Sequence, residues 1–136
     1  IDIKEINTPQ AYKWVPESKT VFGGVSVTSG MHVWTADTQT TEARSAWVES
    51  LERMKLLKPN IVIPGHYMGT PLQQDYAVDF TISYLKTFEQ ALAATKNQDG
   101  KQSEKVTDIM TSAYPALPGE SDLELSSQVN TGEIEW

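Results

Sequence analysis

The sequence predicts an α/β fold, in which a β-sheet is packed against helices. Two β-forming segments, residues 11–15 and 20–22, flank a turn and indicate a hairpin. A helical pattern over residues 41–57 comes next, followed by residues 61–63, Ile-Val-Ile, which are apolar at every position. Strand, helix and strand in this order are typical of an α/β layer.

The hairpin is predicted from residue type. Residues 11–15 combine aromatic and β-branched side chains, which favour strands. Residues 16–19, Pro-Glu-Ser-Lys, provide the proline and small polar residue that are typical of a turn. The chain is then expected to return along residues 20–22.

A glycine pair follows the returning strand. Gly23 and Gly24 allow the backbone to bend or to approach a neighbour, such as a metal or substrate, although such a pair more commonly ends a strand. Residues 25–27 are able to continue the strand. Residues 30–37 are expected to form a loop.

The first helix, residues 41–57, is amphipathic and is expected to cover one face of the sheet. Lys58 and Pro59 end it. Residues 61–63 are expected to be a strand buried on both faces, because none of them is polar. Spacings of four, four and three place these side chains on the apolar face of the helix: Ala43, Trp47, Leu51 and Met54.

A long helix is predicted next. Thr70 as its cap, Pro71 at the first helical position and Gln73 as the partner of the cap indicate its start, and it is expected to run to about Lys96. A stripe along this helix is expected to be core or interface rather than a cofactor site. It consists of Tyr76, Phe80, Tyr84, Phe88 and Leu92.

Two shorter helices are expected after a turn at residues 97–100. The first ends where residues 114–119 supply two prolines and a glycine. The second has a capping box at residues 121–124, Ser-Asp-Leu-Glu, and Gly132 as its stop. The apolar face of the first consists of Val106, Ile109, Met110 and Ala113.

The composition is that of one globular, soluble domain spanning residues 1–136. Hydrophobic residues make up 39% and charged residues 21%, which excludes a disordered chain. The net charge of −7 predicts no nucleic-acid partner, and without an apolar stretch of 18 residues we expect no membrane span. The chain has no cysteine, which excludes disulfides and thiolate ligands and leaves the compartment open. Because it begins with Ile1 rather than Met, a processed or cloned piece of a longer protein is expected.

His66 is the leading candidate for a functional residue. It follows Pro64 and Gly65 at the predicted end of an apolar strand, where rigid scaffolds commonly present chemistry. An imidazole in that place can bind a metal or transfer a proton near neutral pH. The alternative is a turn histidine that is hydrogen-bonded to a neighbouring loop.

Three segments together resemble the C-terminal half of the metallo-β-lactamase fold superfamily. Residues 14–24, Trp-Val-Pro-Glu-Ser-Lys-Thr-Val-Phe-Gly-Gly, are similar to the strand, turn and strand that lead to the second metal ligand of that family. Residues 36–38, Ala-Asp-Thr, and the helix with Trp47 form the second segment. Residues 59–66, Pro-Asn-Ile-Val-Ile-Pro-Gly-His, are similar to the strand that supplies its last metal-binding histidine. The resemblance spans about residues 11–67.

The resemblance implies an αββα sandwich of which this chain is one αβ half, with extra C-terminal helices. In the family, the other half carries a His-x-His-x-Asp-His motif and holds one or two zinc ions, which activate a water for hydrolysis by lowering its pKa. This chain has only His32 and His66 and therefore lacks that motif. Since a catalytic zinc site usually needs three protein ligands, His66 is expected to be the one metal ligand from this half, with the N-terminal metal-motif half absent.

Two further positions depart from the family pattern. The family places an Asp, Cys or other ligand just after the glycine that ends the hairpin, where this chain has Val25, which offers no lone pair. The histidine expected about a hairpin earlier is also missing, because residues 1–24 contain none. One metal, an altered ligand set or no metal is therefore expected rather than the usual two-metal site.

His32 and Asp37 are secondary candidates near the expected pocket rim. His32 could line a substrate pocket or donate a proton, or it could pack its ring beside Trp34. Asp37 could orient either histidine, or it could cap the helix at residues 41–57 in competition with nearby threonines. A triad of Ser29, His32 and Asp37 is conceivable, but no recognisable motif supports it.

These observations lead to two functional hypotheses. The first is a fragment of a metal-dependent hydrolase that is inactive alone, whose intact parent acts on a small-molecule ester, lactone, thioester or amide. The second is a non-catalytic binding or assembly module that has lost the metal site. In both, a half-sandwich exposes an apolar sheet face, which predicts self-association or pairing with a missing N-terminal half.

Overall fold

The computed structural model describes residues 1–6, 10–70 and 74–136. Within them, a four-stranded mixed sheet and four helices confirm the predicted α/β class. The elements are β1 (Lys4–Ile6), β2 (Tyr12–Val15), β3 (Thr20–Ser29), α1 (Thr41–Leu56), β4 (Ile61–Tyr67), α2 (Tyr76–Thr95), α3 (Gln102–Ala113) and α4 (Glu120–Asn130).

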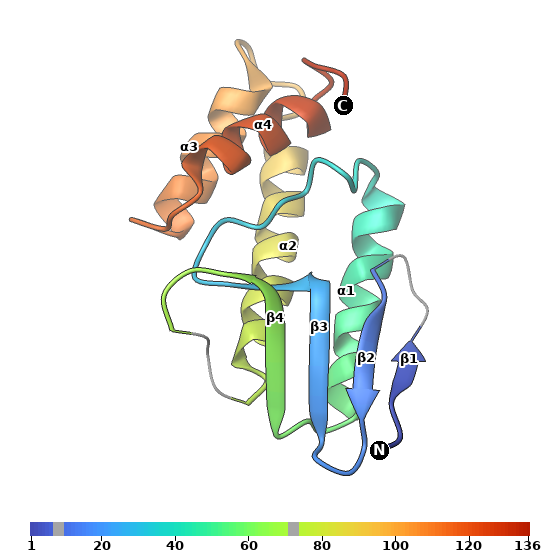
Figure 1. The fold of residues 1–136 in the computed structure, drawn as a ribbon. Coiled ribbons are helices and arrows are strands. Elements are labelled where there is room, and N and C mark those ends of the chain that lie inside the picture. The colour runs from blue at the N-terminus through green and yellow to red at the C-terminus, as the bar shows by residue number, and fades with distance from the viewer. Residues whose placement is uncertain (7–9, 71–73) are drawn as a thin grey trace.

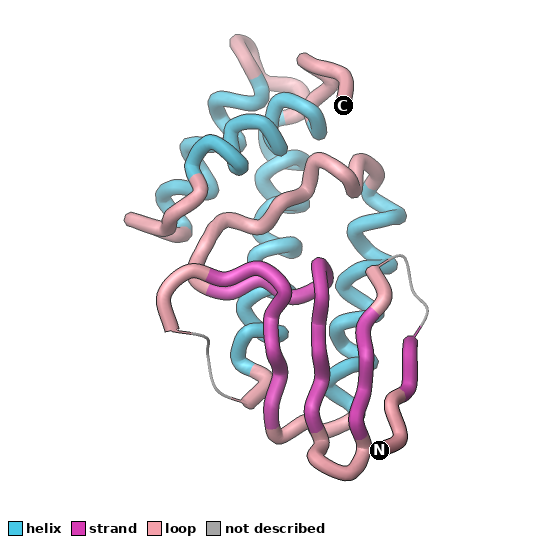
Figure 2. The backbone as a smooth tube through the Cα atoms, in the orientation of Figure 1, coloured by secondary structure: helices cyan, strands magenta, loops and turns pink. Residues whose placement is uncertain are grey.

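The sheet has the strand order β1-β2-β3-β4 (Figures 1 and 2). β2 pairs with β1 and with β3 in antiparallel fashion, so the predicted hairpin is present. β4 lies parallel to β3, because α1 carries the chain back to the end of the sheet where β3 began. β1 has no sequence signal of its own, since Lys4-Glu5-Ile6 offers a single apolar side chain and its extended form depends on pairing with β2.

Helices α1 and α2 lie behind one face of the sheet, while α3 and α4 pack together near the end of α2 (Figure 1). Trp47 of α1 is buried and its indole N–H donates to the Ser26 carbonyl of β3 at 3.0 Å, so this helix does cover the sheet as predicted. No helix in the described part of the chain is long and apolar enough to cross a membrane. The core between sheet and helices includes Trp14, Val21, Leu51, Met54, Val78, Leu85 and Phe88.

The other face of the sheet is left open by every described segment (Figure 1). Ile61 and Ile63 point to it and are 50% and 41% exposed, whereas Val62 between them is 2% exposed. The prediction that residues 61–63 are buried on both faces is therefore wrong for this chain, because its helices cover only one side. The open face carries the exposed apolar side chains of Phe22, Ile61 and Ile63, with Lys13 in register with Phe22. That this face meets a partner stays a prediction.

The glycine pair serves one of the roles that the sequence offered, the close approach of a neighbour, and that neighbour is the backbone of β4. β3 does not end at Gly23 and Gly24 but continues to Ser29, with shifts of register against β4 at this point. Gly24 has a φ of +54°, and a Cβ on Gly65 would overlap the Gly24 carbonyl. The glycines thus let the two strand backbones approach each other closely.

The helix starts differ from the predicted ones in two of three cases. Thr40 caps α1, since its Oγ1 accepts the N–H of Ala43 at 3.1 Å, so Asp37 is not the cap. α4 begins at Glu120 after Gly119, whose φ of +91° sets the turn into the helix, so the capping box predicted at residues 121–124 is wrong.

The long helix α2 begins at Tyr76, later than the predicted start at Pro71. The capping box predicted at residues 70–73 involves residues 71–73, which lie outside the described residues. Gln74 forms an isolated bridge to Ile61 of β4 rather than a helical turn. Gln74 has a φ of +55°, so the chain turns at this residue before the helix begins.

Candidate functional site

The candidate site lies where β3 and β4 end on the same side of the sheet. Thr28 of β3 is the register partner of His66 on β4, and a pocket of about 110 Å³ opens beside them. Loop and helix side chains complete the pocket. Its lining includes Val25, Thr28, Trp34, Asp37, Trp47 and His66.

His66 is exposed in the mouth of this pocket. β4 continues to Tyr67, so His66 is the penultimate residue of the strand rather than the residue after it. Among the described residues, its side chain makes no hydrogen bond or ion pair. The imidazole is therefore available to a ligand or a metal, and the alternative of a turn histidine bonded to a neighbouring loop has no contact in its favour.

Asp37 is held by two tryptophans instead of by a histidine. The indole N–H of Trp34 donates to its Oδ2 at 2.9 Å, and the indole N–H of Trp136 donates to its Oδ1 at 2.7 Å. The two indole rings meet edge to face, with centroids 5.2 Å apart. Asp37 lines the pocket as expected, but it orients a tryptophan. Trp136 could not have been found from the sequence, because it lies 99 residues along the chain from Asp37.

His32 is 1% exposed and does not line the pocket, so the expectation that it lies at the rim is wrong. Its Nδ1 is 2.8 Å from the hydroxyl of Tyr84 on α2, and its backbone N–H donates to the Pro118 carbonyl at 2.9 Å. The predicted packing role is correct in kind, but the partner is Tyr84 rather than Trp34. Because His32 faces Tyr84 and Asp37 faces two indoles, the Ser29-His32-Asp37 triad does not form.

Burial shifts the pKa values of both His32 and Tyr84. Desolvation lowers the pKa of His32, opposed in part by the carboxylates of Glu120 and Asp122. Desolvation also raises the pKa of Tyr84. Both groups are therefore neutral at pH 7, which suits a structural hydrogen bond between two elements.

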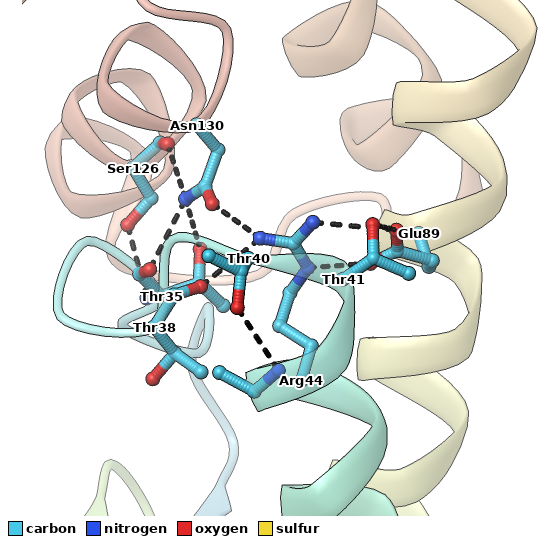
Figure 3. Close-up of polar contacts among 9 residues, drawn as sticks. Thr35, Thr38, Thr40, Thr41, Arg44, Glu89, Ser126 and Asn130 are labelled. Carbon is cyan, nitrogen blue, oxygen red and sulfur yellow. Dashed lines mark hydrogen bonds and ion pairs between the residues drawn. The ribbon is translucent and has the colours of Figure 1, made fainter.

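A polar network centred on Arg44 holds the loop that carries Trp34 and Asp37 (Figure 3). The Arg44 guanidinium donates to the Thr38 carbonyl at 3.0 Å, to Asn130 at the end of α4, and to the carboxylate of Glu89 on α2. The amide of Asn130 in turn donates to the carbonyl of Thr35 at 3.1 Å. Three helices thus fix the loop that forms one wall of the pocket.

The donor atoms of the described residues do not fit a complete zinc site. Val25, at the position where the family would place a ligand, lines the pocket with carbon alone. Each oxygen of Asp37 already accepts an indole N–H, and His32 is buried elsewhere. In the described ranges, no group of three His, Cys, Asp or Glu side chains is placed to share a metal ion. His66 is therefore a single candidate ligand, and the assignment remains a prediction.

The chain matches no protein-family model, and no curated protein is significantly similar to it. Its resemblance to the metallo-β-lactamase superfamily therefore rests on the residues quoted above. The pocket geometry places His66 and Asp37 in one lining, and the described residues add no third donor to them.

Proposed function

We propose that this chain is the C-terminal αβ portion of a metallo-β-lactamase-like, metal-dependent hydrolase. The observation that carries the proposal is a sheet covered on one side only, with exposed apolar side chains on its open face. At the end of this sheet, His66 has no side-chain partner among the described residues. An αββα sandwich buries the inner face of each of its two sheets. A second αβ half would cover this face and bring its own metal ligands towards His66.

The open face of the sheet carries exposed apolar side chains, as a surface that contacts another protein would. Phe22 on β3 lies opposite Ile63 on β4. Ile61, two residues before Ile63, lies on the same side of the sheet. All three side chains are between two-fifths and one-half exposed. Neighbouring apolar side chains on β3 and on the edge strand β4 form a patch that proteins rarely leave to water.

The expected chemistry belongs to the intact parent. Zinc is the metal that the family would hold between its halves, and His66 is the ligand proposed for this half. Hydrolysis of a small-molecule ester, lactone, thioester or amide is the expected reaction class. The chain alone is expected to be inactive, because it brings fewer than the three ligands that a catalytic zinc usually needs.

Reconstitution tests this proposal. The segment encoded upstream of Ile1 is expected to contain a His-x-His-x-Asp-His motif, and joined to this chain it should hydrolyse a chromogenic ester when zinc is added. The variant His66→Ala should lose that activity and bound zinc, while Glu104→Ala, on the outer side of α3, should keep both. A zinc-dependent, His66-sensitive rate from this chain alone would contradict the proposal, as would an upstream segment without the motif.

A non-catalytic binding or assembly module is the second candidate. It is favoured by Val25 at the expected ligand position and by the absence of a three-donor group among the described residues. Elemental analysis of the purified chain and of its reconstituted parent separates the two candidates. Zinc in the parent that depends on His66 favours the hydrolase, and a stable parent without metal favours the module.

Both candidates require that the open face be covered, by a missing half or by a second copy. Sedimentation of this chain should therefore show association that grows with concentration. Ile63→Lys places a charge on the open face and should give a monomer. Leu56→Lys is the matched control, because Leu56 is an exposed apolar residue at the end of α1, away from that face. A wild-type chain that stays monomeric at high concentration would rule out self-association.

A further inference from the structure

We propose that the pocket beside His66 binds a small uncharged group with an apolar body, such as a branched acyl or alkyl amide. Trp34, Trp47 and Val25 would hold the apolar body, and the His66 imidazole would hydrogen-bond its polar end. As a substrate subsite this inference rests on the proposed function, but as a binding site it depends only on the geometry of this chain.

The pocket walls present mainly carbon because their indole N–H groups are already used. The N–H of Trp47 donates to the Ser26 carbonyl at 3.0 Å, and the N–H of Trp34 donates to Asp37 at 2.9 Å. Val25 adds an aliphatic surface. Such walls favour an apolar ligand, because burying its apolar surface lowers the free energy of binding. Neither indole N–H remains free to donate to a polar ligand.

The backbone of β3 beside the pocket is also hydrogen-bonded. The backbone N–H of Thr28 donates to the Thr81 hydroxyl at 3.1 Å, and the same hydroxyl donates to the Thr28 carbonyl at 3.0 Å. These contacts engage the backbone of Thr28, although the one Thr81 proton is shared with the carbonyl of Ala77 at 2.8 Å. Among the polar side chains of the lining, Gln10 bonds Thr38 at 3.4 Å, and the exposed imidazole of His66 is a titratable group placed to orient a ligand by a hydrogen bond.

Charge selects against ionic ligands of either sign. Lys and Arg side chains are missing from the described lining, a carboxylate stands at the rim and the chain carries a net charge of −7, so an anion would be repelled. A cation would lose water on entering the pocket, and the indole N–H bonds to both oxygens of Asp37 offset part of the attraction of that carboxylate for it. An uncharged ligand avoids both costs.

Trp136 acts as the positioning residue for the Trp34 wall. It donates its indole N–H to Asp37 and packs its ring edge to face against Trp34. The segment that carries it is itself anchored, because the Glu133 carboxylate accepts the N–H and the hydroxyl of Ser103 at 3.2 and 2.8 Å. The pocket is thus preformed, which reduces the entropy lost when a ligand binds.

Nuclear magnetic resonance on the ¹⁵N-labelled, metal-free chain tests the proposal with four probes: isobutyramide, acetamide, isobutyrate and tetramethylammonium. Isobutyramide should shift the indole N–H of Trp34 and the ring signals of His66 in a saturable way. Acetamide should bind at least about fivefold more weakly, because it lacks the methyl groups that the pocket would bury. Isobutyrate and tetramethylammonium should also bind more weakly than isobutyramide.

Three variants assign the effect to the pocket. Trp34→Ala removes a wall and should weaken isobutyramide binding at least about tenfold. Trp136→Phe keeps a ring but removes the N–H donor, and it should weaken binding by a smaller factor. Phe22→Ala is the matched control, since it removes an exposed aromatic ring on the open sheet face and should leave binding unchanged.

Equal binding of the anion or the cation would overturn the proposal, as would an unsaturable shift or a Trp34→Ala variant that binds normally. The result is separable from the proposed function, since it needs neither zinc nor hydrolysis. Saturable isobutyramide binding in a chain whose parent has no hydrolase activity would contradict the proposed function alone. The reverse pattern would contradict only the pocket assignment.

Discussion

The two histidines of the chain have opposite environments. His66 stands open to solvent at the end of β4, and His32 is enclosed and bonded to Tyr84. The sequence singled out His66 because Pro64 and Gly65 suggested a strand end; β4 in fact continues to Tyr67, and the role of His66 as a metal ligand stays a prediction. It could not show that His32 is buried, because the element that covers His32 is the distant helix α2.

The burial of His32 predicts a loss of stability in acid. Burial lowers the pKa of His32 in the folded protein below its ordinary value of 6.5, so the unfolded chain takes up the proton first as pH falls. The contribution of neutral His32 to the free energy of unfolding is therefore complete above about pH 6.5 and is lost as pH falls through the folded pKa. Urea unfolding at a series of pH values measures this.

The variant His32→Asn should flatten the acid-side dependence, because it replaces the imidazole with a group that does not titrate but can still bond to Tyr84. His66→Asn is the control and should retain the dependence. An unchanged slope in His32→Asn would show that other groups cause the loss.

At the scale of elements, one hydroxyl joins strand β3 to helix α2. Thr81 is fully buried, and its Oγ1 bonds both the N–H and the carbonyl of Thr28 as well as the carbonyl of Ala77. The shift of register between β3 and β4 near Thr28 leaves those strand groups in need of another partner. The Thr81 side chain of α2 therefore supplies hydrogen bonds that pairing between β3 and β4 does not provide.

Thr81→Val should therefore destabilise the protein by about 1–3 kcal/mol, because it keeps the shape of the side chain and leaves buried backbone groups of Thr28 without a partner. Thr87→Val is the matched control on the same helix, since the Thr87 hydroxyl bonds only the carbonyl of Ser83 in an exposed place. Chemical denaturation of both variants measures the difference. Equal costs for the two would argue against the bridging role.

Element existence was largely predictable, and element ends were less so. The periodicity of apolar residues located α1, α2 and α3, and β-branched residues located the hairpin. The start of α4 was missed because a left-handed Gly119 sets it, rather than a capping box. The continuation of β3 through residues 25–27 was offered by the sequence, but its approach to Gly65 on β4 is a contact that no local pattern contains.

At the scale of the whole molecule, Arg44 joins three helices. Its side chain is almost fully buried, and it contacts the loop at Thr38, Glu89 on α2 and Asn130 on α4 (Figure 3). The Arg44 guanidinium holds the pKa of Glu89 below its usual range. A planar guanidinium offers five N–H donors in a rigid fork, whereas an ammonium offers three from a single nitrogen.

Arg44→Met should lower the free energy of unfolding by about 2–4 kcal/mol, because Asn130 and the Thr38 carbonyl lose a charged donor in a buried place. Arg44→Lys should restore only part of this loss. Thermal and urea unfolding of both variants provide the measurement. Full recovery in Arg44→Lys would show that the charge alone matters and that the fork of hydrogen bonds does not.

The sequence by itself determined the α/β class, the hairpin, the helix that crosses between the parallel strands, and the position of His66 at a strand end. These follow from local periodicity and turn chemistry, which act between residues close in the chain. Only the tertiary structure decided that Asp37 pairs with two tryptophans, that His32 is buried against Tyr84, and that Ile61 and Ile63 face outward. Those outcomes depend on which distant elements cover which surface, and an apolar strand has the same residues whether its second face is covered or open.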